Sequence, residues 1–297
     1  MQTKPYGMKE GFLIGGGLVL AGLMLQLSIG PVDWDAFRWP VNGIVLAVFL
    51  ALVAIAFLLR KKVYGFQFIG TYKAAVPALV YAVVLTIIMG MTRQEVNGTW
   101  LTNMLSFWPF VLIYVYMAVI LGLVVLRQLK SWAAASFSLF TFHFSLLPHL
   151  GLFLAMTCAT LGNADMQRLK MITVKGEPEW RALNSQQQIV EMPFSIELKD
   201  FIMETYDDGM PRRFASDIQV VTKTGGHIQA TVEVNKPVEV DGWKIYQYGY
   251  DTQMGAMSKT SILELVSDPW LPLVYTGIYM MLAGAVCMFL KGKKVKK

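Results

Sequence analysis

The feature that most constrains this chain is a series of long apolar stretches that contain no acidic residue, lysine or arginine. The hydrocarbon core of a bilayer is roughly 30 Å thick, so one helix needs about 20 such residues to cross it. Six stretches are long enough, and each is predicted to be a membrane-spanning helix. They are residues 12–29, 41–59, 74–91, 107–126, 137–161 and 270–290.

Composition excludes the soluble classes. Hydrophobic residues make up 55% of the chain and charged residues only 15%, whereas ordinary soluble domains carry roughly 25% charge. A soluble enzyme and a nucleic-acid-binding protein are therefore excluded. The basic tail at 291–297 follows a predicted span, where lysines are expected to contact anionic lipid headgroups. We expect the lipid bilayer, and no nucleic acid, among the partners.

The chain is expected to divide into a membrane domain at 1–161 with five spans, a polar domain at 162–269, a sixth span and the tail. Lysine and arginine are concentrated at alternate span ends, which indicates the cytoplasmic side. They are Lys4, Lys9, Arg60, Lys61, Lys62, Lys73, Arg127, Lys130 and five lysines of the tail, against Arg38 and Arg93 in the opposite short loops. Both termini are thus predicted to be cytoplasmic, and residues 162–269 extracytoplasmic.

The polar domain alternates apolar and polar residues with period two, as in 190–199 and 228–235. This alternation is typical of strands with one buried face. Gly225-Gly226 and Asp241-Gly242 are typical hairpin turns. About six strands are expected in roughly a hundred residues, which predicts a small antiparallel β-sandwich or open barrel.

Two histidines, His143 and His149, lie in the 137–161 stretch and are the ionisable groups of the predicted spans that could act near neutral pH. Ionisable groups inside a membrane are costly and usually face a bundle interior or a cofactor. Each histidine could be a hydrogen-bonded packing residue, a proton relay or an axial ligand of heme iron. They are about 240° apart around a helix, so they cannot both ligate one iron.

Pro148 directly precedes His149, which is expected midway along its span. A proline within a helix removes an amide donor, so we expect it to bend the helix just before this histidine. No other predicted span offers a histidine. An opposing heme ligand would therefore come from another chain.

Several segments from His149 onward resemble the ResB (CcsB) family of cytochrome c biogenesis proteins. The chain resembles a compact variant, and its most specific matches are Val-Asn-Lys-Pro at 234–237 and Gly-Trp-Lys-Ile-Tyr-Gln-Tyr-Gly-Tyr at 242–250. The resemblance implies that His149 matches a transmembrane heme-ligating histidine, whereas His143 has no counterpart in the family and remains an alternative candidate for the axial ligand. It assigns family-signature or partner-docking roles to Asn235, Pro237, Gly242, Tyr246, Gln247, Gly249 and Tyr250.

For function, the resemblance implies a bacterial inner-membrane subunit of the system II cytochrome c synthetase. Such a subunit would carry heme b transiently and present it, with a ResC/CcsA-like partner, for covalent attachment to apocytochrome c. This chain would be a non-catalytic or co-catalytic part of that heme lyase, with no catalytic residue or further metal of its own. The alternatives are a non-catalytic membrane scaffold that displays the outer β domain and a heme-b electron-transfer subunit.

Overall fold

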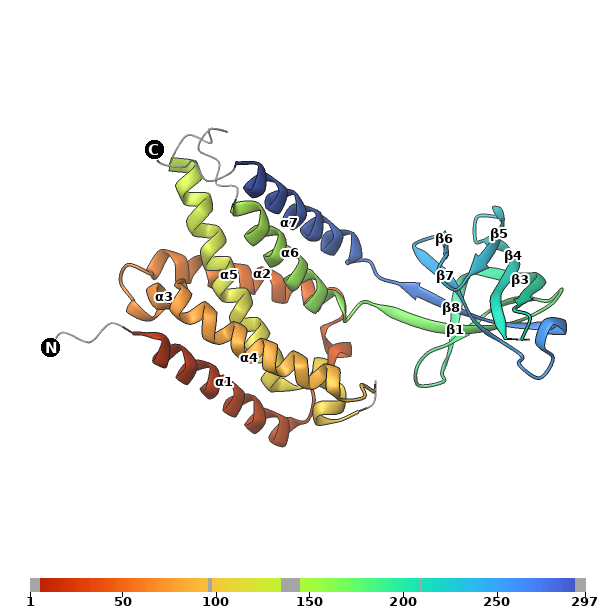
Figure 1. Ribbon diagram of the computed structural model, residues 1–297, viewed down its shortest axis with the longest axis horizontal. Coiled ribbons are helices and arrows are strands. Elements are labelled where there is room, and N and C mark those ends of the chain that lie inside the picture. Colours follow the sequence, from red (N-terminus) through yellow and green to blue (C-terminus); the bar gives the residue numbers. More distant parts are fainter. Residues whose placement is uncertain (1–5, 96–97, 135–144, 209, 292–297) are drawn as a thin grey trace. The chain divides into compact units, whose positions relative to one another are not determined.

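The computed structural model describes residues 6–95, 98–134, 145–208 and 210–291 (Figure 1). The chain separates into two compact units. Unit 1 combines Met1–Asp165 with Trp270–Lys297, and unit 2 is Met166–Pro269. Each is described by itself below.

Unit 1 is helical. Its helices are α1 (Met8–Ile29), α2 (Val41–Leu59), α3 (Tyr64–Ile69), α4 (Tyr72–Met91), α5 (Trp108–Ala134), α6 (Leu146–Gly162) and α7 (Leu271–Lys291), with short 3₁₀ helices at Trp34–Phe37 and Trp100–Ser106. Five of these segments are long and apolar enough to cross a membrane: α1, α2, α4, α5 with its preceding 3₁₀ turn, and α7. This architecture is that of a membrane protein with a β domain.

The fifth predicted span, 137–161, differs from the others. Helix α6 has 17 residues, which is shorter than the roughly 20 that a full crossing needs. It ends at Gly162, close to the predicted end at 161, but begins at Leu146 rather than at 137. Residues 135–144 lie outside the described residues. Among the described residues, the structure therefore gives five candidate spans and one shorter apolar helix.

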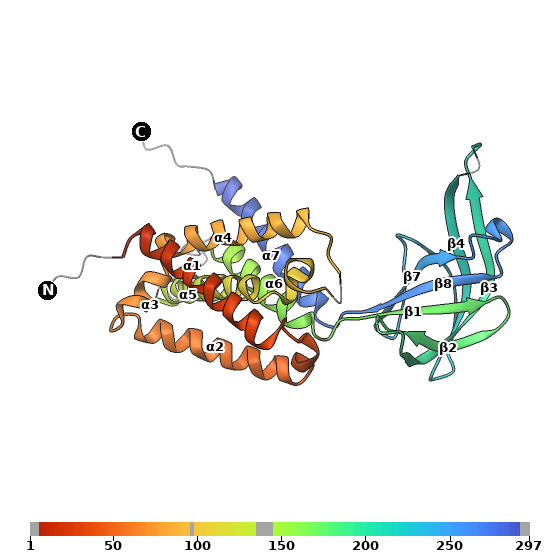
Figure 2. The same cartoon turned by 90° about the horizontal axis from the view of Figure 1, so that it is seen from below.

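Small residues allow α6 and α7 to pack closely (Figure 2). A Cβ atom added at Gly277 would lie 2.5 Å from the carbonyl oxygen of Gly151 and 2.7 Å from the amide nitrogen of Ala155. Pro148 packs in the same way on Gly284. Helices in lipid associate through close van der Waals contact rather than a hydrophobic driving force, and small residues make that contact possible.

Unit 2 is an antiparallel sheet of eight strands. They are β1 (Gln167–Val174), β2 (Pro178–Leu183), β3 (Ile189–Thr205), β4 (Pro211–Thr222), β5 (His227–Glu233), β6 (Val238–Val240), β7 (Trp243–Tyr250) and β8 (Thr260–Ser267). The spatial order is β5-β4-β3-β2-β1-β8-β7-β6. The predicted antiparallel β domain is confirmed, but the expected number of about six strands is too low. Sequence analysis missed β2, in which only Ala182 is buried, and β6, which has three residues.

The sheet curves until its two edge strands meet. Strands β5 and β6 stand at opposite ends of the sheet order, yet only residues 234–237 connect them. So short a connection requires the edges to be neighbours, and the two strands are in contact. All eight strands contribute buried side chains to one core, among them Met171, Ile196 and Leu263. Of the two predicted forms, this single curved sheet corresponds to the open barrel.

Both predicted hairpin turns are present. Val240 pairs with Trp243 across Asp241-Gly242, and these two turn residues have φ of 50° and 80°. Two central residues with positive φ define a type I′ turn, whose twist matches that of the flanking strands. The second turn joins β4 to β5 and contains Gly225 at a φ of 83°.

Candidate functional site

His149 lies in the first turn of α6, at the Leu146 end. Its Nδ1 atom lies 2.5 Å from the carbonyl oxygen of Ser145. A carbonyl oxygen can only accept, so Nδ1 carries the proton and Nε2 keeps its lone pair. Histidines that bind metals usually have this arrangement, in which a backbone carbonyl fixes the ring through the nitrogen that does not bind. The imidazole is therefore oriented to act as a ligand through Nε2.

Helix α5 supports this arrangement from the side. The amide nitrogen Nε2 of Gln128 donates to the Ser145 hydroxyl at 3.2 Å and lies 3.5 Å from His149 Nδ1. Gln128 is thus placed to hold the Ser145 turn against α5. The ring orientation then depends on two helices rather than on α6 alone.

The structure corrects two local expectations about this histidine. His149 is near the Leu146 end of the described helix, not midway along it. Pro148 occupies the first turn of α6, where an amide donor would have no intrahelical partner in any case. Its contact with Gly284 gives it a packing role. The helical bond that Pro148 would interrupt involves residue 144, which, like His143, lies outside the described residues.

His149 lines an open cavity of about 510 Å³ within unit 1. That volume is within the range of roughly 300–1,000 Å³ usual for small-molecule sites. Aromatic rings form much of its wall: Tyr6 packs edge-on against Tyr64 at 5.0 Å and against Phe68 at 5.4 Å between ring centroids. The Tyr6 amide also donates to the Tyr64 hydroxyl at 3.0 Å. The cavity thus offers flat apolar surface beside an imidazole.

The polar part of the cavity is basic. Lys73 at the start of α4 and Arg127 near the end of α5 both line it, and its lining contains no aspartate or glutamate. The Arg127 guanidinium donates to the Gly70 carbonyl, which fixes the side chain and leaves further N–H donors. Within the described ranges, neither cation pairs with a carboxylate. The arrangement favours a ligand with an apolar body and an acidic group.

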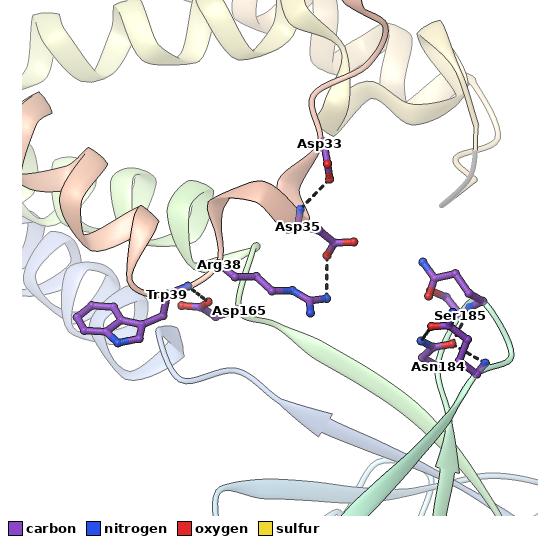
Figure 3. A network of polar contacts seen from close by, with 9 residues as sticks. Asp33, Asp35, Arg38, Trp39, Asp165, Asn184 and Ser185 are labelled. Carbon is purple, nitrogen blue, oxygen red and sulfur yellow. Dashed lines mark hydrogen bonds and ion pairs between the residues drawn. The ribbon is translucent and has the colours of Figure 1, made fainter.

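The other end of α6 carries a polar cluster that sequence analysis missed, and Figure 3 shows its contact between Trp39 and Asp165. The Asp165 carboxylate, just beyond α6, accepts hydrogen bonds from the Trp39 amide at 2.8 Å, Asn42 Nδ2 at 2.7 Å and Trp270 Nε1 at 2.6 Å. These donors join the start of α2 and the residue before α7 to the end of α6. The sequence feature that could have pointed to this cluster is Asn42, a polar residue at the start of a predicted span. The structure shows that it is fully buried.

The same contacts set the acidity of Asp165. Partial burial acts to raise the pKa of this carboxyl, but the three hydrogen bonds and the nearby Arg38 guanidinium outweigh burial, so the pKa lies below its usual value. A carboxylate that accepts several N–H bonds is held in its charged form. Asp165 is therefore an anion that is held by three donors and ties helix ends together, which is a structural role.

In unit 2, the signature residues concentrate at two structural features. Asn235 and Pro237 are exposed and lie in the short connection between the edge strands β5 and β6. Gly242 occupies the positive-φ turn between β6 and β7. These three residues therefore lie where the curved sheet closes and where its last strands turn.

The remaining signature residues shape β7. The pairing of β7 with β8 shifts register between Gln247 and Gly249, which is a β-bulge. Gln247 is 1% exposed; its Nε2 donates to the Gly249 carbonyl at 2.8 Å and to the Ser261 hydroxyl at 2.9 Å. The partly buried Tyr250 ring stacks on Phe201 with centroids 5.0 Å apart. Tyr246 is also partly buried.

Comparisons with known proteins agree with this layout. Residues 137–262 match the model of the ResB-like family. A curated relative, the cytochrome c biogenesis protein CcsB of Prochlorococcus marinus subsp. pastoris, is 26% identical over 119 residues, which is 40% of this chain and 27% of that protein. The chain thus matches little more than a quarter of the length of this relative.

A solved structure of the cytochrome c heme lyase CcmF aligns with a TM-score of 0.38 and 14% identity, over 96% of this chain and 46% of that one. We draw nothing from so low a score. The family match covers α6, where His149 lies, and the sheet up to the first residues of β8, which includes all the signature residues. The resemblance to the ResB (CcsB) family that the sequence predicts is therefore confirmed, and residues 137–262 of this chain are a ResB-like region.

Proposed function

We propose that this protein takes part in cytochrome c biogenesis as a ResB-like subunit of a system II cytochrome c synthetase. In this role it carries heme b transiently and, with a ResC/CcsA-like partner, presents it for attachment to apocytochrome c. Heme is the cargo rather than a resident cofactor. The chain itself is a non-catalytic or co-catalytic subunit.

One observation carries the proposal: His149 presents an Nε2 lone pair beside a cavity with aromatic walls. Its Nδ1 proton is held by the Ser145 carbonyl at 2.5 Å, which makes Nε2 the ligating nitrogen. The cavity is large enough to take a substantial part of a porphyrin, and the exposed rings of Tyr6 and Tyr64, backed by the buried Phe68, supply aromatic surface that a porphyrin face packs against. His149 thus acts as one axial ligand.

A second axial ligand comes from the partner. In the described part of unit 1, His149 is the one histidine, and His143 cannot ligate the same iron from the same helix, so a six-coordinate iron needs a ligand from another chain. A ResC/CcsA-like membrane protein supplies it and receives the heme. This arrangement makes heme delivery an event at an interface rather than within one subunit.

The signature residues serve mainly to build the β domain. Gln247 is inside the core, so a partner could reach it only if the sheet opened. Gly242, Gly249 and Tyr250 shape the turn, the bulge and the aromatic packing around it. The exposed Asn235 and Pro237 and the partly buried Tyr246 are the signature positions available for docking. We place this domain outside the bacterial inner membrane and both termini in the cytoplasm.

The test is the heme content and reduced absorption spectrum of the full chain, purified alone and with a ResC-like partner. His149→Ala should lower bound heme and cytochrome c output while the complex still assembles, since a single truncation costs only a few kcal/mol. Added imidazole should restore part of both. His227→Ala is the matched control, because this exposed histidine binds Gln219 at 2.9 Å in the β domain.

His143→Ala separates the two candidate ligands. Normal heme in His143→Ala together with depleted heme in His149→Ala supports the assignment. The reverse pattern assigns the ligand to His143, and normal heme in both variants leaves the membrane scaffold as the function. Two bound hemes with reversible electron exchange and no effect on cytochrome c output would instead favour the electron-transfer subunit.

A further inference from the structure

The His149 cavity has a second chemical character that heme ligation does not use. Lys73 and Arg127 enter it from α4 and α5, and no acidic residue lines it. Both cations lie outside residues 137–262, so the family match does not extend to them. Their presence beside three tyrosines and a histidine needs an explanation of its own.

Arg127 is held in place rather than free to move away. Its guanidinium donates to the carbonyl of Gly70, in the turn between α3 and α4. Because Gly70 also lines the cavity, this bond keeps the guanidinium at the cavity wall. The group has five N–H donors in a planar fork, so the remaining donors can grip a carboxylate in two-point fashion.

Lys73 adds a second positive charge from another helix. Glu10 on α1 attracts Lys73 through charge, but the Glu10 carboxylate accepts the Gly7 amide at 2.5 Å and does not form an ion pair with Lys73. In the described part of the chain, Lys73 forms no ion pair. Lys73 is half-buried and Arg127 is exposed where they line the open cavity, so both cations are available to form charge-assisted hydrogen bonds with an anionic ligand.

We infer that Lys73 and Arg127 bind the propionate carboxylates of heme while its iron faces His149, so that the cavity selects porphyrins by their acidic side chains. The inference rests on the proposed function and extends it from iron ligation to recognition of the macrocycle. A porphyrin dicarboxylate matches all three elements of the site: a flat apolar body, two acidic groups and a metal.

The experiment compares ferric heme with heme dimethyl ester, in which both carboxylates are esterified. Each is titrated into the full chain in detergent and followed by absorbance. Wild type should bind the acid at least tenfold more tightly than the ester. Arg127→Gln and Lys73→Gln should each weaken binding of the acid by roughly tenfold and leave binding of the ester unchanged.

Two further variants make the comparison specific. Lys130→Gln removes an exposed cation on the same helix that does not line the cavity, and it should change neither affinity. Arg127→Lys keeps the charge without the planar fork, and it should fall between wild type and Arg127→Gln. Equal folding of all variants is checked by circular dichroism and gel filtration.

The outcomes separate this inference from the proposed function. Equal binding of acid and ester by wild type, or equal losses for both in Arg127→Gln, would overturn the inference even if His149→Ala changes the heme spectrum. A preserved preference for the acid with an unchanged spectrum in His149→Ala supports propionate recognition and removes the ligand role.

Vesicles test the other source of an anionic group. If phosphatidylglycerol vesicles, but not phosphatidylcholine vesicles, displaced bound heme and wild type showed no preference for the acid, the cations would serve a lipid headgroup and the inference would be wrong. Equal behaviour of the two vesicles alongside a preference for the acid supports it.

Discussion

The two ends of α6 differ in how far their polar side chains are already hydrogen-bonded. At the Leu146 end, His149 lines an open cavity together with two cations that form no ion pair among the residues that the structure describes. At the Gly162 end, Asp165 accepts three hydrogen bonds from two other segments. A saturated polar group contributes to stability, whereas an unsaturated one is available to a ligand. One helix therefore carries a structural anchor and a candidate binding site about four turns apart.

The largest effect is expected in an experiment that determines on which side of the membrane each end of α6 lies. In a Cys158→Ala, Cys287→Ala background, Lys223→Cys should react with an impermeant thiol reagent in intact cells, and Lys296→Cys should react only after lysis. The excess of lysine and arginine at alternate span ends is the physical reason. Labelling of the tail but not of the β domain would invert the topology and remove the proposed function.

Removing the Asp165 carboxylate should lower the stability of the folded protein. Asp165→Ala removes the acceptor that the Trp39 amide, Asn42 and Trp270 share, although Asn42 keeps a bond to the Leu161 carbonyl at 3.3 Å, and we expect a loss of roughly 2–4 kcal/mol. Thermal unfolding in detergent measures it. Asp35→Ala is the control, because its ion pair with Arg38 joins side chains that are 67% and 59% exposed and is worth about 1 kcal/mol or less. Equal effects of the two variants would contradict the anchoring role.

The stability that Asp165 provides should depend on pH. Because the folded pKa of Asp165 lies below its usual value of 3.8, its contribution is fully present above that value and is lost as pH falls through the lowered pKa. Wild type should therefore lose stability below about pH 4 more steeply than Asp165→Asn. Parallel pH profiles would show that the carboxylate is not held by these contacts. His149→Ala should leave this difference unchanged.

The smallest effect is expected at Gln128, which helps to position the His149 ring but does not line the cavity. Gln128→Ala removes the 3.2 Å bond to the Ser145 hydroxyl, so we expect about 1 kcal/mol less stability and a several-fold weaker affinity for heme. Because His149 keeps its bond to the Ser145 carbonyl, the position of the heme absorption bands should not change. Gln128→Glu should recover part of the affinity. A spectrum like that of His149→Ala would show that Gln128 does more than position the ring.

The local alternation of apolar and polar residues predicts most of the strands and their buried faces. The period-two alternation of 190–199 predicts the buried face of β3, where Met192, Phe194, Ile196 and Leu198 are all buried. The same reasoning was less successful for 228–235, where Val232 is buried but Ile228 and Val234 are more than a third exposed. β5 is an edge strand, and an edge strand has fewer neighbours to cover its apolar face.

The sequence by itself determined the long spans, the Asp241-Gly242 turn and the candidate ligand His149, because each depends on residues close together in the chain. Tertiary structure alone decided that Gln247 is inside the core, that residues 234–237 join the two edges of the sheet, and that Lys73, Arg127 and His149 line one cavity. Asp165 shows the reason most plainly: its partners Asn42 and Trp270 are 123 and 105 positions away. No periodicity reports contacts over such separations, since they exist only once the helices have packed.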